Sequence, residues 1–231
     1  MQYIFYFLIM GVFSFIMADN QSVYHVPIQG TIDMGLPHYL QRVINQAESK
    51  EAVAIIIEID TFGGRVDAAT QMKDIILDSK VTTVAFINKR AISAGALISL
   101  SCDSIFMTAG ASIGAATAVD LKGEKASEKV ISYMREEMAS TAEANNRSRD
   151  VATAMVDEEL SIPFIVNNFG DTLTSKDVEG FSEGKLVTLS TNMALLLGIA
   201  DKELNNIDDI LNHMNLENAD KVEIKESWSE I

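Results

Sequence analysis

The chain has 231 residues, of which 48% are hydrophobic and 22% are charged, a balance typical of a globular protein with one substantial core. Its formal net charge of −15 argues against nucleic acid as a partner, because binding to a phosphate backbone needs a basic surface. The single cysteine, Cys102, excludes an internal disulfide framework and a cysteine-rich metal site. We expect Cys102 to be buried, and we expect neither a metal nor a cofactor.

An apolar segment opens the chain. Residues 2–17 are almost entirely apolar. A membrane span needs about 20 such residues, so the segment better suits the core of a signal peptide. We interpret residues 1–19 as a signal peptide or N-terminal anchor, 20–215 as the folded domain and 216–231 as a charged tail. Trp228 in that tail is typical of the approach to a membrane interface. The expected location is the periplasmic or extracellular face of a membrane.

Apolar runs of strand length then alternate with segments of helical period. The expected strands cover residues 54–59, 81–87, 104–108 and 185–189. The expected helices cover residues 66–76, a short segment from Ser93, and residues 127–145, 149–159, 192–197 and 207–213. Residues 110–116 are expected to form a loop of small residues, and 168–184 an inserted loop. The alternation predicts a single α/β domain, in which crossover helices join the strands of a parallel sheet.

Ser93 is the candidate nucleophile, because it follows an expected strand and begins a helix. A serine hydroxyl is protonated at neutral pH and needs a neighbouring base before it attacks a carbonyl. The three histidines, His25, His38 and His213, lie near the ends of the chain. A Ser-His-Asp triad would therefore have to bring a histidine from far away in the sequence. The alternative role for Ser93 is that of a helix N-cap, a position at which serine is favoured.

Lys129 is the candidate base. A lysine can replace histidine if its pKa falls from about 10.4 towards 7, and burial or a nearby positive potential has that effect. Lys129 opens a segment whose apolar residues share one helical face, so its amine would lie at the positive end of the helix dipole. Lys122 and Lys125 are rivals, although both lie in a polar loop that we expect to be solvated. The alternative is that Lys129 is an ordinary surface lysine.

Gly63 and Gly64 follow a buried strand and precede a helix. Without side chains, their backbone amides are open to a ligand. One of these amides, together with that of Ala94, would stabilise the oxyanion of a tetrahedral intermediate, a role worth about 3–4 kcal/mol for each donor. The alternative for the glycine pair is a simple strand-to-helix turn.

Three segments in a fixed order resemble a known family. They are residues 59–66 (IDTFGGRV), 92–96 (ISAGA) and 110–115 (GASIGA). The chain resembles the membrane-bound ClpP-class serine proteases of the NfeD type, related to signal peptide peptidase A, and the resemblance runs from residue 23 to residue 215.

The resemblance implies a ClpP/crotonase-like fold and a Ser-Lys dyad, with Ser93 as nucleophile and Lys129 as base. Backbone amides of Gly63, Gly64 and Ala94 would form the oxyanion hole.

The resemblance also implies a homo-oligomer, dimeric or larger, that cuts apolar segments of membrane-associated proteins, stomatin-like partners among them. Phe62 departs from the pattern, because proline is frequent at this position in the family. Two alternatives stay open. One is a catalytically silent scaffold with the same fold. The other is a crotonase-type enzyme acting on acyl-coenzyme A, which would be cytoplasmic and offers no role for Ser93.

Overall fold

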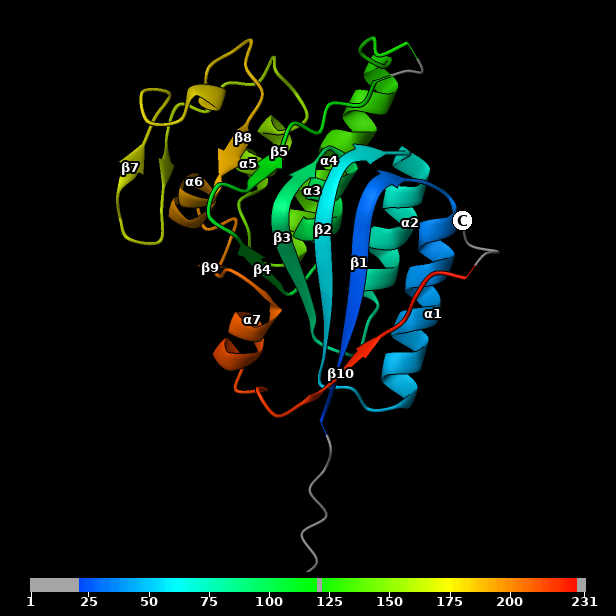
Figure 1. The fold of residues 1–231 in the computed structure, drawn as a ribbon. Coiled ribbons are helices and arrows are strands. Elements are labelled where there is room, and N and C mark those ends of the chain that lie inside the picture. The colour runs from blue at the N-terminus through cyan, green and yellow to red at the C-terminus, as the bar shows by residue number, and fades with distance from the viewer. Residues whose placement is uncertain (1–20, 120–121, 228–231) are drawn as a thin grey trace, which may run out of the picture.

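A mostly parallel sheet forms the centre of the computed structural model, which describes residues 21–119 and 122–227 (Figure 1). The strands are β1 (Ser22–Ile32), β2 (Ala54–Gly64), β3 (Thr83–Ile92), β4 (Ser104–Met107), β5 (Ser112–Gly114), β6 (Ile165–Val166), β7 (Thr172–Leu173), β8 (Thr188–Ser190), β9 (Lys202–Glu203) and β10 (Asp220–Glu223). The helices are α1 (Gly35–Ser49), α2 (Val66–Leu77), α3 (Ala94–Leu100), α4 (Glu128–Ala144), α5 (Arg149–Ala154), α6 (Thr191–Leu196) and α7 (Ile207–His213), with a 3-10 turn η1 (Glu179–Phe181).

The sheet has the strand order β10-β1-β2-β3-β4-β9, and these neighbours are parallel. Strand β5 pairs with the end of β3, and β8 is antiparallel to β5. The two short strands β6 and β7 form a separate antiparallel hairpin. The predicted α/β fold, with a parallel sheet and crossover helices, is confirmed.

Both faces of the central strands are apolar because both are covered, as in other parallel sheets. On one face, Ile55, Ile57 and Ile59 of β2 belong to the larger core, which they share with α1 to α4. On the other face, Ile56 belongs to a smaller core with Ile210 of α7. Figure 1 shows α2 and α4 behind the central strands and α7 on the other side.

The carboxyl ends of β2 and β3 meet at the upper edge of the sheet in Figure 1. Their register pairs Thr61 with Ala91, so the residues that follow the two strands lie side by side. Helix α2 begins just after β2, and α3 begins just after β3. This edge, at the carboxyl ends of the strands, is where open α/β sheets bind ligands.

Several predicted boundaries need correction. The expected helix 149–159 ends at Ala154, because the carbonyls of Ala154 and Met155 accept the amides of Val187 and Ala116 instead of continuing the helix. The expected strand 185–189 is replaced by β8, which starts only at Thr188, since the Lys185 amide closes a turn onto Ser182.

Short strands account for the other differences. The expected loop 110–116 contains β5, and the expected loop 168–184 contains β7 and η1. The expected tail 216–231 contributes β10, so the sheet continues past residue 215. Backbone pairing with distant segments creates β5 and β10, whereas β7 forms a local hairpin with β6 and η1 is a local 3-10 turn. Strand β1 and helix α1 were not identified from the sequence.

Cys102 is buried and unpaired, as predicted. Burial raises the pKa of its thiol to about 12, so at neutral pH it is a protonated thiol and not a nucleophile. Across residues 21–119 and 122–227, the structure contains no helix with the length and apolar character that a membrane crossing requires.

Candidate active site

Ser93 occupies a strained turn between β3 and α3. Its backbone has φ 57° and ψ −119°, a conformation that residues with a side chain rarely adopt. Two hydrogen bonds hold the turn: the Ser93 amide donates to the Gly114 carbonyl (3.0 Å), and the Ala96 amide donates to the Ser93 carbonyl (2.9 Å). A strained serine at a strand-to-helix turn presents its hydroxyl outward, as in the nucleophile elbow of other hydrolases.

The Ser93 hydroxyl is not used to cap α3. No side-chain capping bond is present, and Oγ makes no hydrogen bond with any residue that the structure describes. The alternative interpretation of Ser93 as a helix N-cap therefore explains its position but not its conformation.

Gly63 lies against Ser93. A Cβ atom at position 63 would lie 2.6 Å from Ser93 Cβ and 3.1 Å from Ser93 Oγ, so only glycine permits this approach. Its φ of 108° also favours glycine. Gly64 is equally constrained, since a Cβ there would lie 2.1 Å from the Ile32 carbonyl oxygen. The structure therefore brings the predicted glycine pair to the predicted nucleophile.

The three predicted oxyanion donors differ in availability. The Gly63 amide donates to Thr61 Oγ1 at 2.9 Å, so it is already engaged. The Ala94 amide is at the first position of α3, where amides have no acceptor within their own helix. The Gly63 amide is therefore the least suitable of the three, and the Ala94 amide suits the role. Sequence reasoning did not single out Thr61, because only the folded turn brings its hydroxyl to the Gly63 amide.

The structure places Lys129 in the first turn of α4, as predicted, but does not join it to Ser93. Its side chain is exposed, so burial does not withdraw the amine from water. Within the described residues, Lys129 forms no ion pair or hydrogen bond, and none connects it with Ser93. Catalytic hydrogen bonds are often absent from ligand-free structures and form only once substrate is bound.

Two other lysines are held by carboxylates. Lys73 of α2 lies 2.7 Å from Asp74 and 2.8 Å from Glu137; burial of its amine lowers its pKa, but these two partners outweigh that effect and raise it. The same balance raises the pKa of Lys125, which pairs with Glu158 and Glu159 at 3.4 Å. Both amines therefore stay charged, and neither suits the role of base.

An apolar groove of about 660 Å³ lies between α2 and α4. Val66, two residues after Gly64, lines one side, and Val130, next to Lys129, lines the other. The groove is thus lined by sequence neighbours of both parts of the candidate site, although Ser93 and Lys129 themselves do not line it. The complete lining comprises Arg65, Val66, Asp67, Thr70, Gln71, Val130 and Tyr133. One hint of the groove lies in the sequence, in the three-residue spacing of Val130 and Tyr133 on α4.

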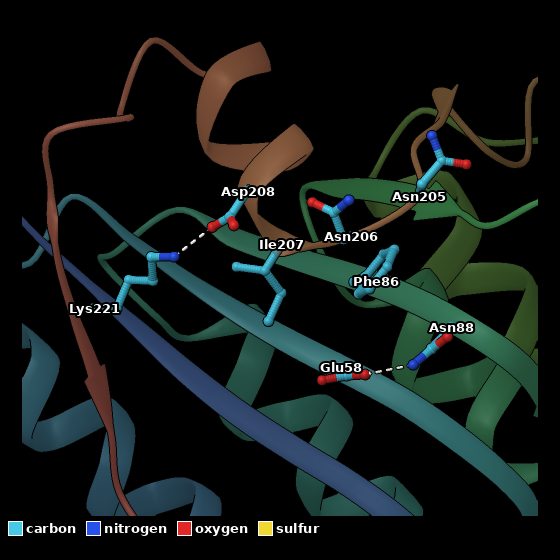
Figure 2. A pocket seen from close by; sticks show the side chains of 8 residues that line it. All are labelled: Glu58, Phe86, Asn88, Asn205, Asn206, Ile207, Asp208 and Lys221. Carbon is cyan, nitrogen blue, oxygen red and sulfur yellow. Dashed lines mark hydrogen bonds and ion pairs between the residues drawn. The ribbon is translucent and has the colours of Figure 1, made fainter.

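A second hollow lies on the opposite face of the sheet, beside α7 (Figure 2). Its lining comprises Glu58, Phe86, Asn88, Asn205, Asn206, Ile207, Asp208 and Lys221, which include no serine, threonine or cysteine. Its charged groups are paired in place. Asn88 donates to Glu58 at 2.6 Å, His25 lies 2.8 Å from the same carboxylate, and Lys221 pairs with Asp208. This hollow has no nucleophile for acyl transfer.

The histidines do not complete a triad in this structure. His25 contacts Glu58, and His213 contacts Lys202 at 3.0 Å and the ring of Phe106. Within the described residues, neither His25 nor His213 forms a hydrogen bond or ion pair with Ser93. In the part of the chain that the structure describes, no three His, Cys, Asp or Glu side chains are grouped as a metal site requires.

The fold agrees with comparisons to known proteins. The family model "NfeD1b, N-terminal domain" matches residues 22–224. The chain therefore belongs to the NfeD1b N-terminal domain family.

Two curated relatives are membrane proteins by name. The chain is 34% identical to the Membrane protein NfeD1b of Bacillus subtilis over 92% of this chain and 46% of that protein. It is 33% identical to the Membrane-bound protease PH1510 of Pyrococcus horikoshii over 64% of this chain and 35% of that protein. The chain thus spans less than half the length of these two relatives.

Solved structures show the same fold. A lysine-to-alanine mutant of the 1510-N membrane-bound stomatin-specific protease, in complex with a substrate peptide, superposes with a TM-score of 0.72 at 24% identity, covering 91% of this chain and 95% of that one. ClpP1 from Listeria monocytogenes superposes with a TM-score of 0.55 at 23% identity, covering 79% of this chain and 91% of that one.

Proposed function

We propose that the protein is a membrane-associated serine endopeptidase that cuts apolar segments of membrane-associated proteins. The observation that carries this proposal is the strained turn at Ser93, whose hydroxyl forms no hydrogen bond with the described residues and whose neighbour Gly63 fits only as glycine. Structural turns rarely keep such strain, whereas active sites do.

In the proposed mechanism, Ser93 Oγ attacks the peptide carbonyl while the Lys129 amine takes its proton. The amides of Gly64 and Ala94 hold the oxyanion of the tetrahedral intermediate. Lys129 then gives the proton to the leaving amine, and an ester of Ser93 remains. Water, deprotonated by Lys129, hydrolyses this ester and releases the second product.

Lys129 must turn towards Ser93 for this chemistry. Substrate in the groove between α2 and α4 would cover Val130 and displace water from the amine beside it, which disfavours its charged form. The start of α4 acts in the same direction, since the positive end of a helix dipole repels an ammonium group.

The apolar lining of the groove supports an apolar substrate side chain. PH1510 is named a membrane-bound protease, and its N-terminal part a stomatin-specific one. We extend this to a stomatin-like partner for the present chain, to a homo-oligomer, and to a site on the periplasmic or extracellular side of a membrane. The leader expected at residues 1–19 lies outside the described residues.

A catalytically silent scaffold is the second candidate. The exposed amine of Lys129, with no bond to Ser93, is the observation that favours it. An enzyme acting on acyl-coenzyme A is less well supported, because the strained serine would have no function in it.

Cleavage by the full chain in detergent tests the proposal, with an unfolded protein and an apolar peptide as substrates. We expect cleavage by the wild type, and losses of at least about a hundredfold in kcat for both Ser93→Ala and Lys129→Ala, the scale at which removal of catalytic groups acts. Lys125→Ala is the matched control for a lysine on the same side of the molecule and should retain activity.

Labelling with a fluorophosphonate separates the two candidates. An active dyad predicts modification of Ser93 that is lost in Lys129→Ala while circular dichroism is unchanged. A folded wild type that neither cleaves nor reacts would indicate the scaffold, and cleavage by Ser93→Ala would indicate another nucleophile.

A further inference from the structure

Phe62 is a large aromatic side chain that stays 73% exposed beside the candidate nucleophile. It immediately precedes Gly63, which touches Ser93. Along the end of β2, Thr61 and Gly63 are buried while Phe62 points outward. An exposed ring of this size at a candidate site suggests a contact with a ligand rather than with the core.

A charged network holds the ring in place. The Arg90 guanidinium lies 4.5 Å from the centre of the Phe62 ring, within cation–π distance. Arg90 in turn lies 3.4 Å from Asp60, and Lys89 lies 3.5 Å from the same carboxylate. The ring is therefore supported by Arg90 and leaves most of its surface open.

The position of this pair relative to Ser93 follows from the strands. Arg90 is three residues before Ser93 on β3, and Phe62 is one residue before Gly63 on β2. Side chains alternate between the two faces of a strand. Phe62 and Arg90 therefore lie on the opposite face of the sheet edge from Thr61 and Gly63. The groove between α2 and α4 lies on the face that these helices cover.

We propose that Phe62, supported by Arg90, is a specificity-determining residue that binds an aromatic or large aliphatic side chain of the substrate. This inference rests on the proposed peptidase function and adds a second subsite to it. Successive side chains of an extended peptide point in opposite directions, so one peptide crossing the sheet edge at Ser93 reaches both the groove and Phe62.

The charges around the Phe62 ring determine which substrate side chains are disfavoured there. Lys89 and Arg90 face one carboxylate, Asp60, so this corner carries a net positive charge within a chain of net charge −15. A lysine or arginine side chain of the substrate would be repelled here. An apolar side chain would instead stack on the open surface of Phe62.

A peptide series tests the inference with the full chain. Each peptide carries Phe, Leu, Gly or Lys at one position on either side of the scissile bond. For Phe62→Ala we expect kcat/KM to fall about threefold to tenfold on the Phe and Leu peptides, the range of an aromatic contact, and to stay unchanged on the Gly peptide. Phe62→Leu should restore the cleavage of the Leu peptide. Phe169→Ala is the matched control, because Phe169 is 77% exposed on the β6–β7 hairpin.

Binding of the same peptides to Ser93→Ala, with and without Phe62→Ala, gives a readout that does not need catalysis. Weaker binding of the Phe and Leu peptides alone supports the subsite. An equal effect on all peptides, or no effect, overturns it. A wild type that cleaves no peptide contradicts the proposed function, and the binding measurement then still decides whether Phe62 selects apolar side chains.

Discussion

The geometry of the turn at Ser93 is set by close contacts between individual atoms. Gly63 approaches so closely that one added methyl group would overlap Ser93 Cβ, at 2.6 Å. The surrounding bonds fix this arrangement, because the Ser93 amide is tied to Gly114 and the Gly63 amide to Thr61. Ser93 is therefore positioned by the absence of a side chain at Gly63 as much as by its own conformation.

Gly63→Ala should abolish labelling of Ser93 and reduce cleavage by about a hundredfold or more, as expected when reacting groups are displaced by about 1 Å. The cause would be the overlap with Ser93 together with the positive φ of 108°. Fluorophosphonate labelling and kcat measure the effect.

Gly170→Ala is the control for backbone strain alone. Its φ is +87°, yet a Cβ there would meet no atom within 4 Å. It should lower the melting temperature slightly and leave labelling intact. Normal labelling of Gly63→Ala would contradict the assigned contact between Gly63 and Ser93.

At the scale of elements, a partly buried ion pair links α2 and α4, the two walls of the groove. The Lys73 amine is bonded to Glu137 across the helices at 2.8 Å, and the two side chains are only 12% and 18% exposed. Removing the carboxylate charge of Glu137 would leave the Lys73 amine with a weaker partner in a region that is partly shielded from water.

Glu137→Gln should lower the free energy of unfolding by about 1–3 kcal/mol, the range for a hydrogen bond to a charged group. Urea unfolding measures this change. Glu136→Gln removes the neighbouring exposed carboxylate, which pairs with Arg149, and should cost at most about 1 kcal/mol. Equal losses in the two variants would show that the pair between α2 and α4 has no special role.

Elements with a clear apolar period were predictable from the sequence. Residues 66–76 were expected as a helix and form α2, and residues 207–213 form α7 as expected. Helix α1 was missed although its buried residues follow a helical period, whereas the missed strands depend on their partners. Strand β1 contains Pro27, which weakens a strand signal, and β10 is a short charged segment that forms only against β1.

The candidate site was likewise predictable where a local sequence pattern marks it. Ser93 and the glycines follow strands and precede helices, and that pattern is local. Three features require the folded chain: the exposure of Lys129, the capture of the Gly63 amide by Thr61, and the stacking of Phe62 on Arg90. The hydrophobic periodicity of a sequence does not show which side chain a turn brings close to which backbone amide.

On the scale of the whole molecule, one polar network connects three strands on the face opposite α2. Glu58 of β2 accepts from His25 of β1 and from Asn88 of β3. These contacts, the bond to His25 foremost, lower the pKa of Glu58 below 4.5 despite the opposing effect of burial. Its carboxylate therefore favours the folded state wherever the unfolded carboxyl is ionised.

The sign of the pH dependence follows. A lowered folded pKa gives stability that is present above 4.5 and is lost as the pH falls through the folded value. Glu58→Gln should flatten the acid side of the stability profile, measured as the urea midpoint against pH. Glu217→Gln on the exposed surface should keep the wild-type slope. An unchanged slope in Glu58→Gln would show that other carboxylates govern acid unfolding.

The pairing of β10 with β1 has a mechanical consequence. These two strands come from opposite ends of the described chain, run parallel, and are joined by the register from Ser22–Asp220 to His25–Glu223. A pull applied at residue 21 and residue 224 in opposite directions would act along the strands, so their hydrogen bonds would bear the load together instead of opening one after another. The first and last strands would thus act as a clasp that resists tension between the two ends of the domain.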